Sequence, residues 1–194
     1  MTNVAHAGAG TATGAQDSVT IGVAIAVPQP FATELQGLRE SFGDPLASAI
    51  PTHVTLLPPT AVPSSSMDDV RRHLADVSAD NSPFGMRLRG SGTFRPVSPV
   101  VFVQVAEGLV ECEQVERGVR SGVLHRESAF YYHPHVTVAH DLPDPVLDRA
   151  FEALRDYEAV FEVESFSLYR HGADGVWRPQ HEYVFGRPAD EEKA

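Results

Sequence analysis

The sequence predicts an α+β fold with two pseudo-symmetric lobes, and three observations lead to this fold class. The order strand, helix, short strand with His-Val-Thr, helix, strand occurs twice along the 194 residues. In each half the motif histidine follows the end of the first strand at a similar distance, 26 and 30 positions. Apolar residues form 42% of the chain, enough for a sizeable core. Matched order with matched spacing favours two related lobes over unrelated segments.

The first half opens with an apolar, β-branched run at residues 19–27, which predicts a buried strand. Apolar residues at the spacing of one helix face then predict a helix that stops at Gly43: Phe31, Leu35, Leu38 and Phe42. A short strand is expected at residues 53–57, ending at Pro58-Pro59.

A capping-box pattern, Ser66-Met67-Asp68-Asp69, predicts the start of the next helix of the first half. Its apolar stripe consists of Met67, Val70, Leu74 and Val77. Residues 84–94 then read as a strand pair or one bent strand, because Gly90-Ser91-Gly92 lies inside them.

The second half repeats this order, with strands expected at residues 100–105 and 135–139. Between them lies a helical face of Leu109, Cys112, Val115, Val119 and Val123. Asp144 as a cap and Pro145 as a first-turn proline open the last helix. Residues 160–169 and 176–185 are expected to form a closing hairpin.

These elements give one domain at residues 19–187, with lobes of about 19–95 and 96–187. Residues 1–18 are rich in Ala, Gly and Thr and lack the basic start and apolar stretch of a signal peptide, so we expect a disordered tail. Residues 188–194 form a second, charged tail. No segment is long and apolar enough to span a membrane. The single cysteine, Cys112, allows no intrachain disulfide, which favours a cytoplasmic protein.

The formal net charge of −11 bears on the partners of the chain. Long nucleic acids are held by many phosphate contacts from a basic surface, and only 15 Lys and Arg are present. A small nucleotide, or one RNA end in a locally basic pocket, remains open as a partner. The candidate cations are Arg87, Arg89, Arg95, Arg170, Arg178 and Arg187.

The two motifs, His53-Val54-Thr55 and His135-Val136-Thr137, are the strongest functional signal. Residues i and i+2 of a strand point to the same face, so each motif presents an imidazole beside a hydroxyl. Two lobes related by a pseudo-twofold axis could bring both pairs to one cleft. Imidazole can accept or donate a proton near neutral pH, and hydroxyls can stabilise phosphate oxygens. The pattern therefore predicts cleavage of a phosphodiester. The alternative to a catalytic role is a structural one, in which two half-buried strand histidines form hydrogen bonds to the backbone.

With these motifs, in the strings THVTLLPP and HPHVTVAH, the chain resembles the two-histidine phosphoesterases, specifically the 2'-5' RNA ligase-like group. The segment RGSGTFRPVSPVVFVQV between them is similar to the family's link into its second lobe. The resemblance covers roughly residues 19–186. It implies a bilobal α+β protein with a cleft between two antiparallel sheets. It also implies activity on 2',3'-cyclic or related phosphodiesters, or reversible 2'-5' ligation.

Carried over by position, the resemblance implies His53 as general acid, His135 as general base, and Thr55 and Thr137 as phosphate-binding hydroxyls. Which histidine is the acid stays open, because the two exchange roles when the reaction runs backwards. We expect a monomer that needs no cofactor and no metal. A 2'-5' RNA ligase acting on RNA ends and an inactive nucleotide-binding module of the same fold remain as alternatives.

Other residues near the motifs carry weaker functional interpretations. Phe94, Tyr131 and Tyr132 could stack a nucleobase, although a packing role needs no ligand. Trp177 could line the rim of the cleft or pack. His133-Pro134-His135 with His140 suggests a metal site, but no cluster of carboxylate or cysteine ligands stands nearby in the sequence.

Overall fold

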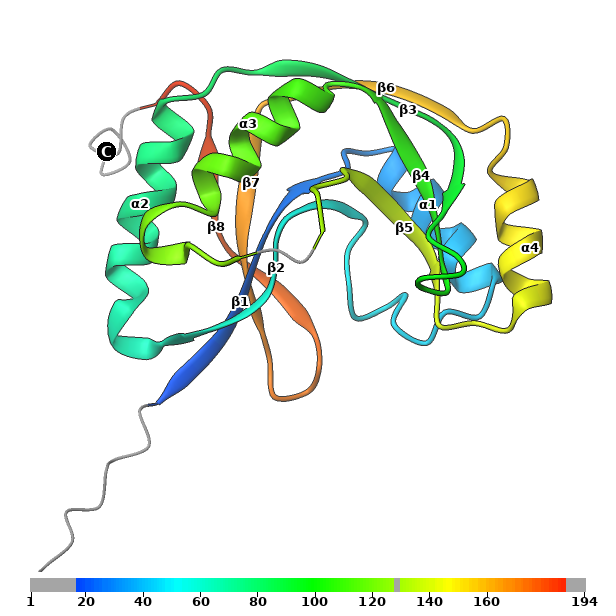
Figure 1. Ribbon diagram of the computed structural model, residues 1–194, viewed down its shortest axis with the longest axis horizontal. Coiled ribbons are helices and arrows are strands. Elements are labelled where there is room, and N and C mark those ends of the chain that lie inside the picture. The colour runs from blue at the N-terminus through cyan, green and yellow to red at the C-terminus, as the bar shows by residue number, and fades with distance from the viewer. Residues whose placement is uncertain (1–16, 128–129, 188–194) are drawn as a thin grey trace, which may run out of the picture.

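The computed structural model describes residues 17–127 and 130–187. Within them, eight strands form a continuous, curled antiparallel sheet in the order β6-β3-β4-β5-β2-β1-β7-β8 (Figure 1). The strands are β1 (Ser18–Ala26), β2 (His53–Pro63), β3 (Phe84–Thr93), β4 (Val100–Glu107), β5 (His135–His140), β6 (Glu158–Val163), β7 (Ser165–His171) and β8 (Trp177–Val184). The helices are α1 (Phe31–Ser41), α2 (Met67–Ala79), α3 (Leu109–Val119) and α4 (Asp144–Ala153). The predicted α+β class with antiparallel strands is confirmed.

The sheet consists of two four-stranded halves that meet between β5 and β2. This junction is narrow, because the two strands share only the pair Val54 and Val136 in register. The halves do not follow the expected lobes 19–95 and 96–187. Strand β3 pairs with β4 and β6, whereas β7 pairs with β1 and β8. The two halves therefore exchange strands.

The expected closing hairpin of residues 160–169 and 176–185 was wrong in its first part. Residues 160–163 belong to β6, at one end of the sheet, while the hairpin itself is β7–β8 at the other end. Only Glu164 separates β6 from β7. This nearly continuous stretch thus ties the two halves of the sheet together.

Strand β2 is longer than predicted and continues through Pro58 and Pro59 to Pro63. The pairing of β1 with β2 shifts register between Ile21 and Val23, and the shift leaves both prolines out of the ladder. Both are exposed, so their missing N–H groups break no pairing. An irregularity of this kind is where a sheet tolerates proline.

The four predicted helices are present, but their ends differ from the predicted caps. Ser66 makes no capping bond and instead ends a 3-10 turn, Ser64–Ser66. Asp144 is the first helical residue of α4, preceded by Pro143 at the cap position. Helix α3 ends at Val119, and Val123 lies exposed in the following 3-10 turn.

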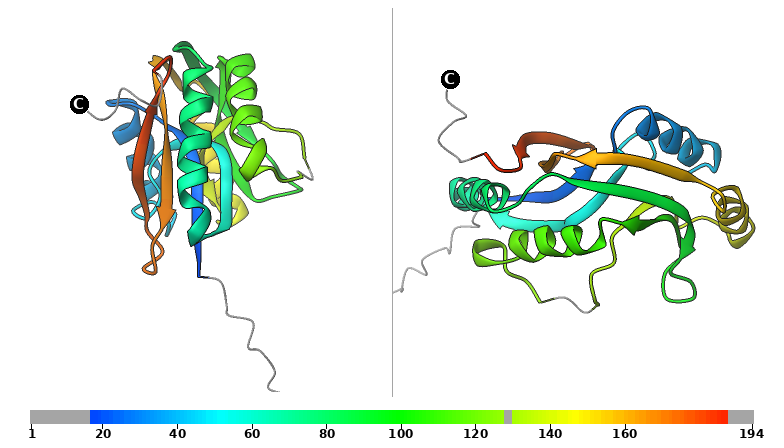
Figure 2. Two further views of the ribbon diagram at one scale, coloured as in Figure 1. Left: turned by 90° about the vertical axis from the view of Figure 1, so that its left-hand side faces the viewer. Right: turned by 90° about the horizontal axis from the view of Figure 1, so that it is seen from above.

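The helices cross over the halves of the sheet in the same symmetric manner. Helix α1, which follows β1, packs against β5 of the other half, and α3, which follows β4, packs against β2. Helices α2 and α4 lie at the two ends of the molecule (Figure 2). The central strands are therefore held by packing from both halves.

The core is continuous across the junction of the two halves and includes Val54 and Val136. Cys112 lies in it, fully buried, and burial raises the pKa of its thiol to about 12. Such a thiol is unreactive near neutral pH and acts as a small hydrophobe. No helix of the described residues is both long and apolar enough to cross a membrane.

Candidate active site

The register of β2 and β5 determines how the two motifs meet. With Val54 opposite Val136 in an antiparallel pair, His53 stands opposite Thr137 and Thr55 opposite His135. The valines are buried in the core, whereas all four motif side chains are half-buried on the other face. The structure thus brings the four predicted residues to one face at the junction of the halves.

His53 is held at both ring nitrogens. Its Nδ1 lies 2.6 Å from the carbonyl oxygen of Pro51, and its Nε2 lies 3.1 Å from Oγ1 of Thr55. A carbonyl oxygen can only accept, so Nδ1 donates and carries the proton of the neutral ring. Nε2 is then left as the basic nitrogen, facing the threonine hydroxyl.

His135 is oriented by the same device. Its Nδ1 lies 2.7 Å from the carbonyl oxygen of His133, two residues earlier in the chain. The ring therefore also takes the tautomer with a proton on Nδ1 and a free Nε2. Both imidazoles therefore take the same tautomer.

Burial lowers the pKa of both imidazoles below the usual 6.5. The bonds to Pro51 and His133 oppose this shift by stabilising the charged ring. The charge of Arg39 lowers the pKa of His53 further, and the charges of His133 and His53 lower that of His135.

The segment before His53 is fixed by a buried ion pair that sequence reasoning missed. Nη2 and Nε of Arg39, on α1, lie 2.9 and 3.1 Å from Oδ2 of Asp44. Nη1 of Arg39 donates to the carbonyl oxygen of Ile50 at 3.0 Å. The loop is thereby anchored one residue before Pro51, the hydrogen-bond acceptor of His53.

The two aromatic candidates take different places. The ring of Phe94 stands edge-on to His135, with centroids 5.0 Å apart, and packs on Phe102. Tyr132 is directed into the core, and its hydroxyl donates to the carbonyl oxygen of Thr55 at 3.0 Å. Tyr132 therefore links the segment before β5 to β2, and Phe94 supports a motif ring. Tyr131 is fully exposed.

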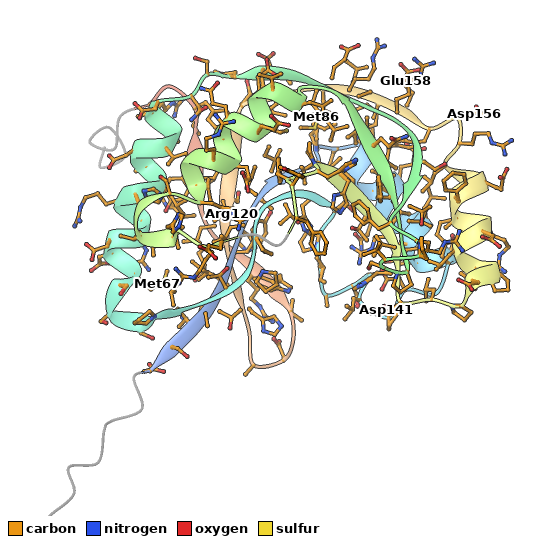
Figure 3. All side chains as sticks on the ribbon, viewed as in Figure 1. Met67, Met86, Arg120, Asp141, Asp156 and Glu158 are labelled. Atoms are coloured by element: carbon orange, nitrogen blue, oxygen red, sulfur yellow. The ribbon has the colours of Figure 1, made fainter. Side chains whose placement is uncertain are left out.

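A cavity of about 290 Å³ adjoins the motifs, and His53, Thr55 and Thr137 line it. Sequence reasoning did not assign His140 to this site, yet it also lines the cavity. The pairing of β5 with β4 skips Val138, and this irregularity returns the side chain of His140 to the same face as Thr137. Nε2 of His140 lies 3.4 Å from Oδ2 of Asp141, labelled in Figure 3 at the end of β5.

Several candidate cations are already paired with carboxylates. Arg87 pairs with Glu107 and Glu158, and Arg95 with Asp144 and Asp148. Arg178 pairs with Asp174 in the β7–β8 hairpin. Among the described residues, no three His, Cys, Asp or Glu side chains group as metal ligands.

Comparisons with known proteins agree with the architecture. A crystal structure of Escherichia coli LigT in apo form covers 88% of this chain and 99% of its own, with a TM-score of 0.58 and 21% identity. LigT complexed with 3'-AMP gives a TM-score of 0.59 at 20% identity, with 88% and 100% coverage. TT0787 of Thermus thermophilus gives 0.57 at 22% identity, with 86% and 98% coverage. These solved structures share the fold.

Sequence relatives extend over nearly the same length. A Bacillus licheniformis protein whose name places it among the phosphoesterases is 29% identical over 158 residues, 79% of this chain and 93% of its own. A similarly named Bacillus cytotoxicus protein is 24% identical over 169 residues, 86% of this chain and 97% of its own. The model of the 2'-5' RNA ligase superfamily matches residues 27–175. The resemblance carried by the two motifs is thus confirmed, and the chain belongs to the 2'-5' RNA ligase superfamily.

Proposed function

We propose that this protein hydrolyses, or reversibly transfers, a small phosphodiester of the 2',3'-cyclic phosphate class without a metal ion. The observation that carries the proposal is the placement of two His-Thr pairs on one face of the β2–β5 junction. Each imidazole presents Nε2 there, because a backbone carbonyl holds its Nδ1. Two proton-transfer groups and two hydroxyls suit a phosphate that is attacked on one side and loses an oxygen on the other.

The hydrolytic step balances with these residues alone. Nε2 of His135 takes a proton from water as the water oxygen bonds to phosphorus. Protonated His53 gives its Nε2 proton to the ribose oxygen as the bond between that oxygen and phosphorus breaks. The hydroxyls of Thr55 and Thr137 donate to the non-bridging oxygens, where negative charge develops. The product is a phosphomonoester, and His53 and His135 have exchanged protonation states.

The relatives support a small nucleotide as the substrate class. LigT, which shares the fold, has been crystallised with 3'-AMP, with NADP+ and with ATP. The relatives from Bacillus are named as phosphoesterases. A nucleoside with one cyclic phosphate fits both the chemistry of the two motifs and these ligands.

The family description favours a second function, 2'-5' ligation of RNA ends, in which a ribose hydroxyl takes the place of water in the same attack on the cyclic phosphate. A strand end needs cations along its phosphates. The ion pairs of Arg87, Arg95 and Arg178 and a net charge of −11 make hydrolysis of a small substrate the stronger proposal. The third alternative, a nucleotide-binding module without turnover, differs from both in the test below.

The test is hydrolysis of the four nucleoside 2',3'-cyclic monophosphates in excess EDTA by the wild type, His53→Ala and His135→Ala. His125→Ala, which removes an exposed imidazole outside the site, is the matched control. We expect turnover by the wild type and the control only. Equal activity in all four proteins would refute the mechanism, and loss of wild-type activity in EDTA would favour a metal-dependent hydrolase. Binding without turnover by the wild type would favour the binding module.

A further inference from the structure

The loop between α1 and β2, residues 42–52, contains the carbonyl group that orients His53. The carbonyl oxygen of Pro51 accepts the Nδ1–H of His53 at 2.6 Å. A protonated ring held in this way releases its proton from Nε2, and the neutral ring accepts a proton at Nε2. The orientation of one peptide group therefore determines which nitrogen of His53 serves the site, whether the ring acts as acid or as base.

The residues on both sides of Pro51 are held by side chains of α1. Before it, Nη1 of Arg39 donates to the carbonyl oxygen of Ile50 at 3.0 Å. After it, Oγ1 of Thr52 donates to Oε1 of Gln36 at 3.0 Å. Gln36 and Arg39 lie three positions apart, on one face of the helix. The helix thus fixes the chain immediately before and after the carbonyl group that His53 uses.

Arg39 is engaged within the protein, although it borders the cavity beside the motifs. It is only 4% exposed, and its Nε, Nη1 and Nη2 atoms bind Asp44 or the carbonyl oxygen of Ile50. Oδ1 of Asp44 accepts the backbone N–H of Leu46 at 2.9 Å, so the carboxylate is tied to the same loop. Arg39 therefore acts on the site through the loop and not by binding substrate.

The second motif has a different support. The carbonyl group that orients His135 belongs to His133, an exposed residue. The ring of His133 lies with its centroid 5.5 Å from that of Phe94 and 5.3 Å from that of Phe102. The two motif imidazoles share a tautomer but depend on different segments, so a change in α1 should affect only His53.

We propose that Arg39 is a positioning residue, which together with Gln36 and Thr52 holds Pro51 so that His53 exchanges protons with the substrate through Nε2. This inference rests on the proposed function and deepens it. It gives the buried ion pair of α1 a catalytic consequence beyond stability. It holds for either direction of proton transfer at His53.

The tautomer of His53 can be measured independently of turnover. Long-range ¹H–¹⁵N NMR spectra distinguish Nδ1–H from Nε2–H in a neutral imidazole, and the spectra of His53→Ala and His135→Ala assign the two rings. Above the pH range in which the rings titrate, the wild type should show Nδ1–H for both. In the double variant Arg39→Met/Asp44→Asn, His53 should lose this single tautomer while His135 keeps it. A double variant in which His53 keeps the wild-type tautomer would overturn the proposal.

The double variant is designed to separate positioning from stability. It leaves no unpaired charge in the core, and the asparagine keeps an acceptor for the N–H of Leu46. Its kcat for a nucleoside 2',3'-cyclic monophosphate should fall about 10- to 100-fold with little change in KM, since a displacement of about 1 Å can cost on the order of 10²-fold.

The matched control is Arg178→Met/Asp174→Asn, the same two changes in an exposed pair. The carboxylate of this pair also accepts a backbone N–H, from Val176 at 3.2 Å. The control should leave kcat and both tautomers unchanged. An equal loss of kcat in the control and in the double variant of α1 would contradict the proposed positioning.

Thr52 tests the other anchor without altering a charge. Thr52→Val removes the hydroxyl that donates to Gln36 and should lower kcat by roughly fivefold, the factor that corresponds to one neutral hydrogen bond. Thr52→Ser keeps the hydroxyl and should restore the rate. If Thr52→Val retains the wild-type kcat and the Nδ1–H tautomer of His53, the positioning is wrong while the two-histidine reaction stands. If the wild type cleaves no cyclic phosphate, the proposed function fails, and the NMR spectra still decide the positioning.

Discussion

The two motif-bearing regions of the sheet have the same chemistry but different surroundings. In both, a strand begins with its histidine, a carbonyl oxygen two residues earlier holds Nδ1, and a threonine shares the face. Around His53 there is a buried ion pair and an apolar cavity. Around His135 there are the rings of Phe94, Phe102 and His133. The pseudo-symmetric fold thus duplicates the proton-transfer groups, and the flanking segments make the two sides unequal.

The largest expected effect tests whether the two regions act as one unit. His53→Ala and His135→Ala should each lower kcat by roughly 10²–10⁴-fold, because each removes one proton-transfer step. The double variant should be little worse than either single variant, because groups that act together are not additive. Steady-state hydrolysis in EDTA measures all three. Multiplicative losses in the double variant would mean that the two histidines act independently.

Stability should distinguish the two regions next. Asp44→Ala leaves the buried guanidinium of Arg39 without its partner and should cost about 3–5 kcal/mol in free energy of unfolding. Urea denaturation measures this loss. Asp174→Ala breaks the exposed pair with Arg178 and is the control, with an expected change within about 1 kcal/mol. Equal losses would show that the buried pair does not anchor the loop before His53.

The threonines allow a finer comparison. Thr55→Val and Thr137→Val should each reduce kcat by up to about 10²-fold, since each removes a donor to the phosphate. Thr55→Val should be the more damaging, because its hydroxyl also lies 3.1 Å from Nε2 of His53. The kcat values of the two variants, each relative to the wild type, measure this difference. A larger effect at Thr137 would contradict this difference between the regions.

The smallest expected effect concerns the link across the junction. Tyr132→Phe removes the hydrogen bond to the carbonyl oxygen of Thr55 and should destabilise the protein by about 1 kcal/mol. Thermal unfolding measures this loss, and Tyr131→Phe is the control. A change in kcat larger than the change in stability explains would give Tyr132 a role in positioning the first motif.

Sequence patterns predicted the α+β class, the helices and the placement of each motif histidine beside its own threonine, because these follow from local periodicity. The i, i+2 spacing sufficed to place His53 with Thr55 and His135 with Thr137. The exchange of β3 and β7 between the halves was not predictable, since it depends on long-range pairing. His140 reaches the cavity only because the pairing of β5 skips Val138, and no local signal marks such a shift.

The buried ion pair of the loop before β2 and the wall of the cavity could not be predicted from the sequence either. Arg39 and Asp44 are five positions apart and read as ordinary surface charges, whereas their burial depends on how α1 packs. Trp177 reaches the cavity because the β7–β8 hairpin lies beside β1. Both features depend on tertiary packing, which local sequence patterns do not show.

The pH dependence of kcat/KM for a nucleoside 2',3'-cyclic monophosphate tests the two-histidine claim most directly. The reaction needs one protonated and one neutral imidazole, so its profile should be bell-shaped. Because burial lowers the pKa of both His53 and His135 in the free enzyme, the maximum should lie below pH 6.5. A bell with its maximum there would support the account. A rate that rises steadily with pH through the histidine range would contradict it.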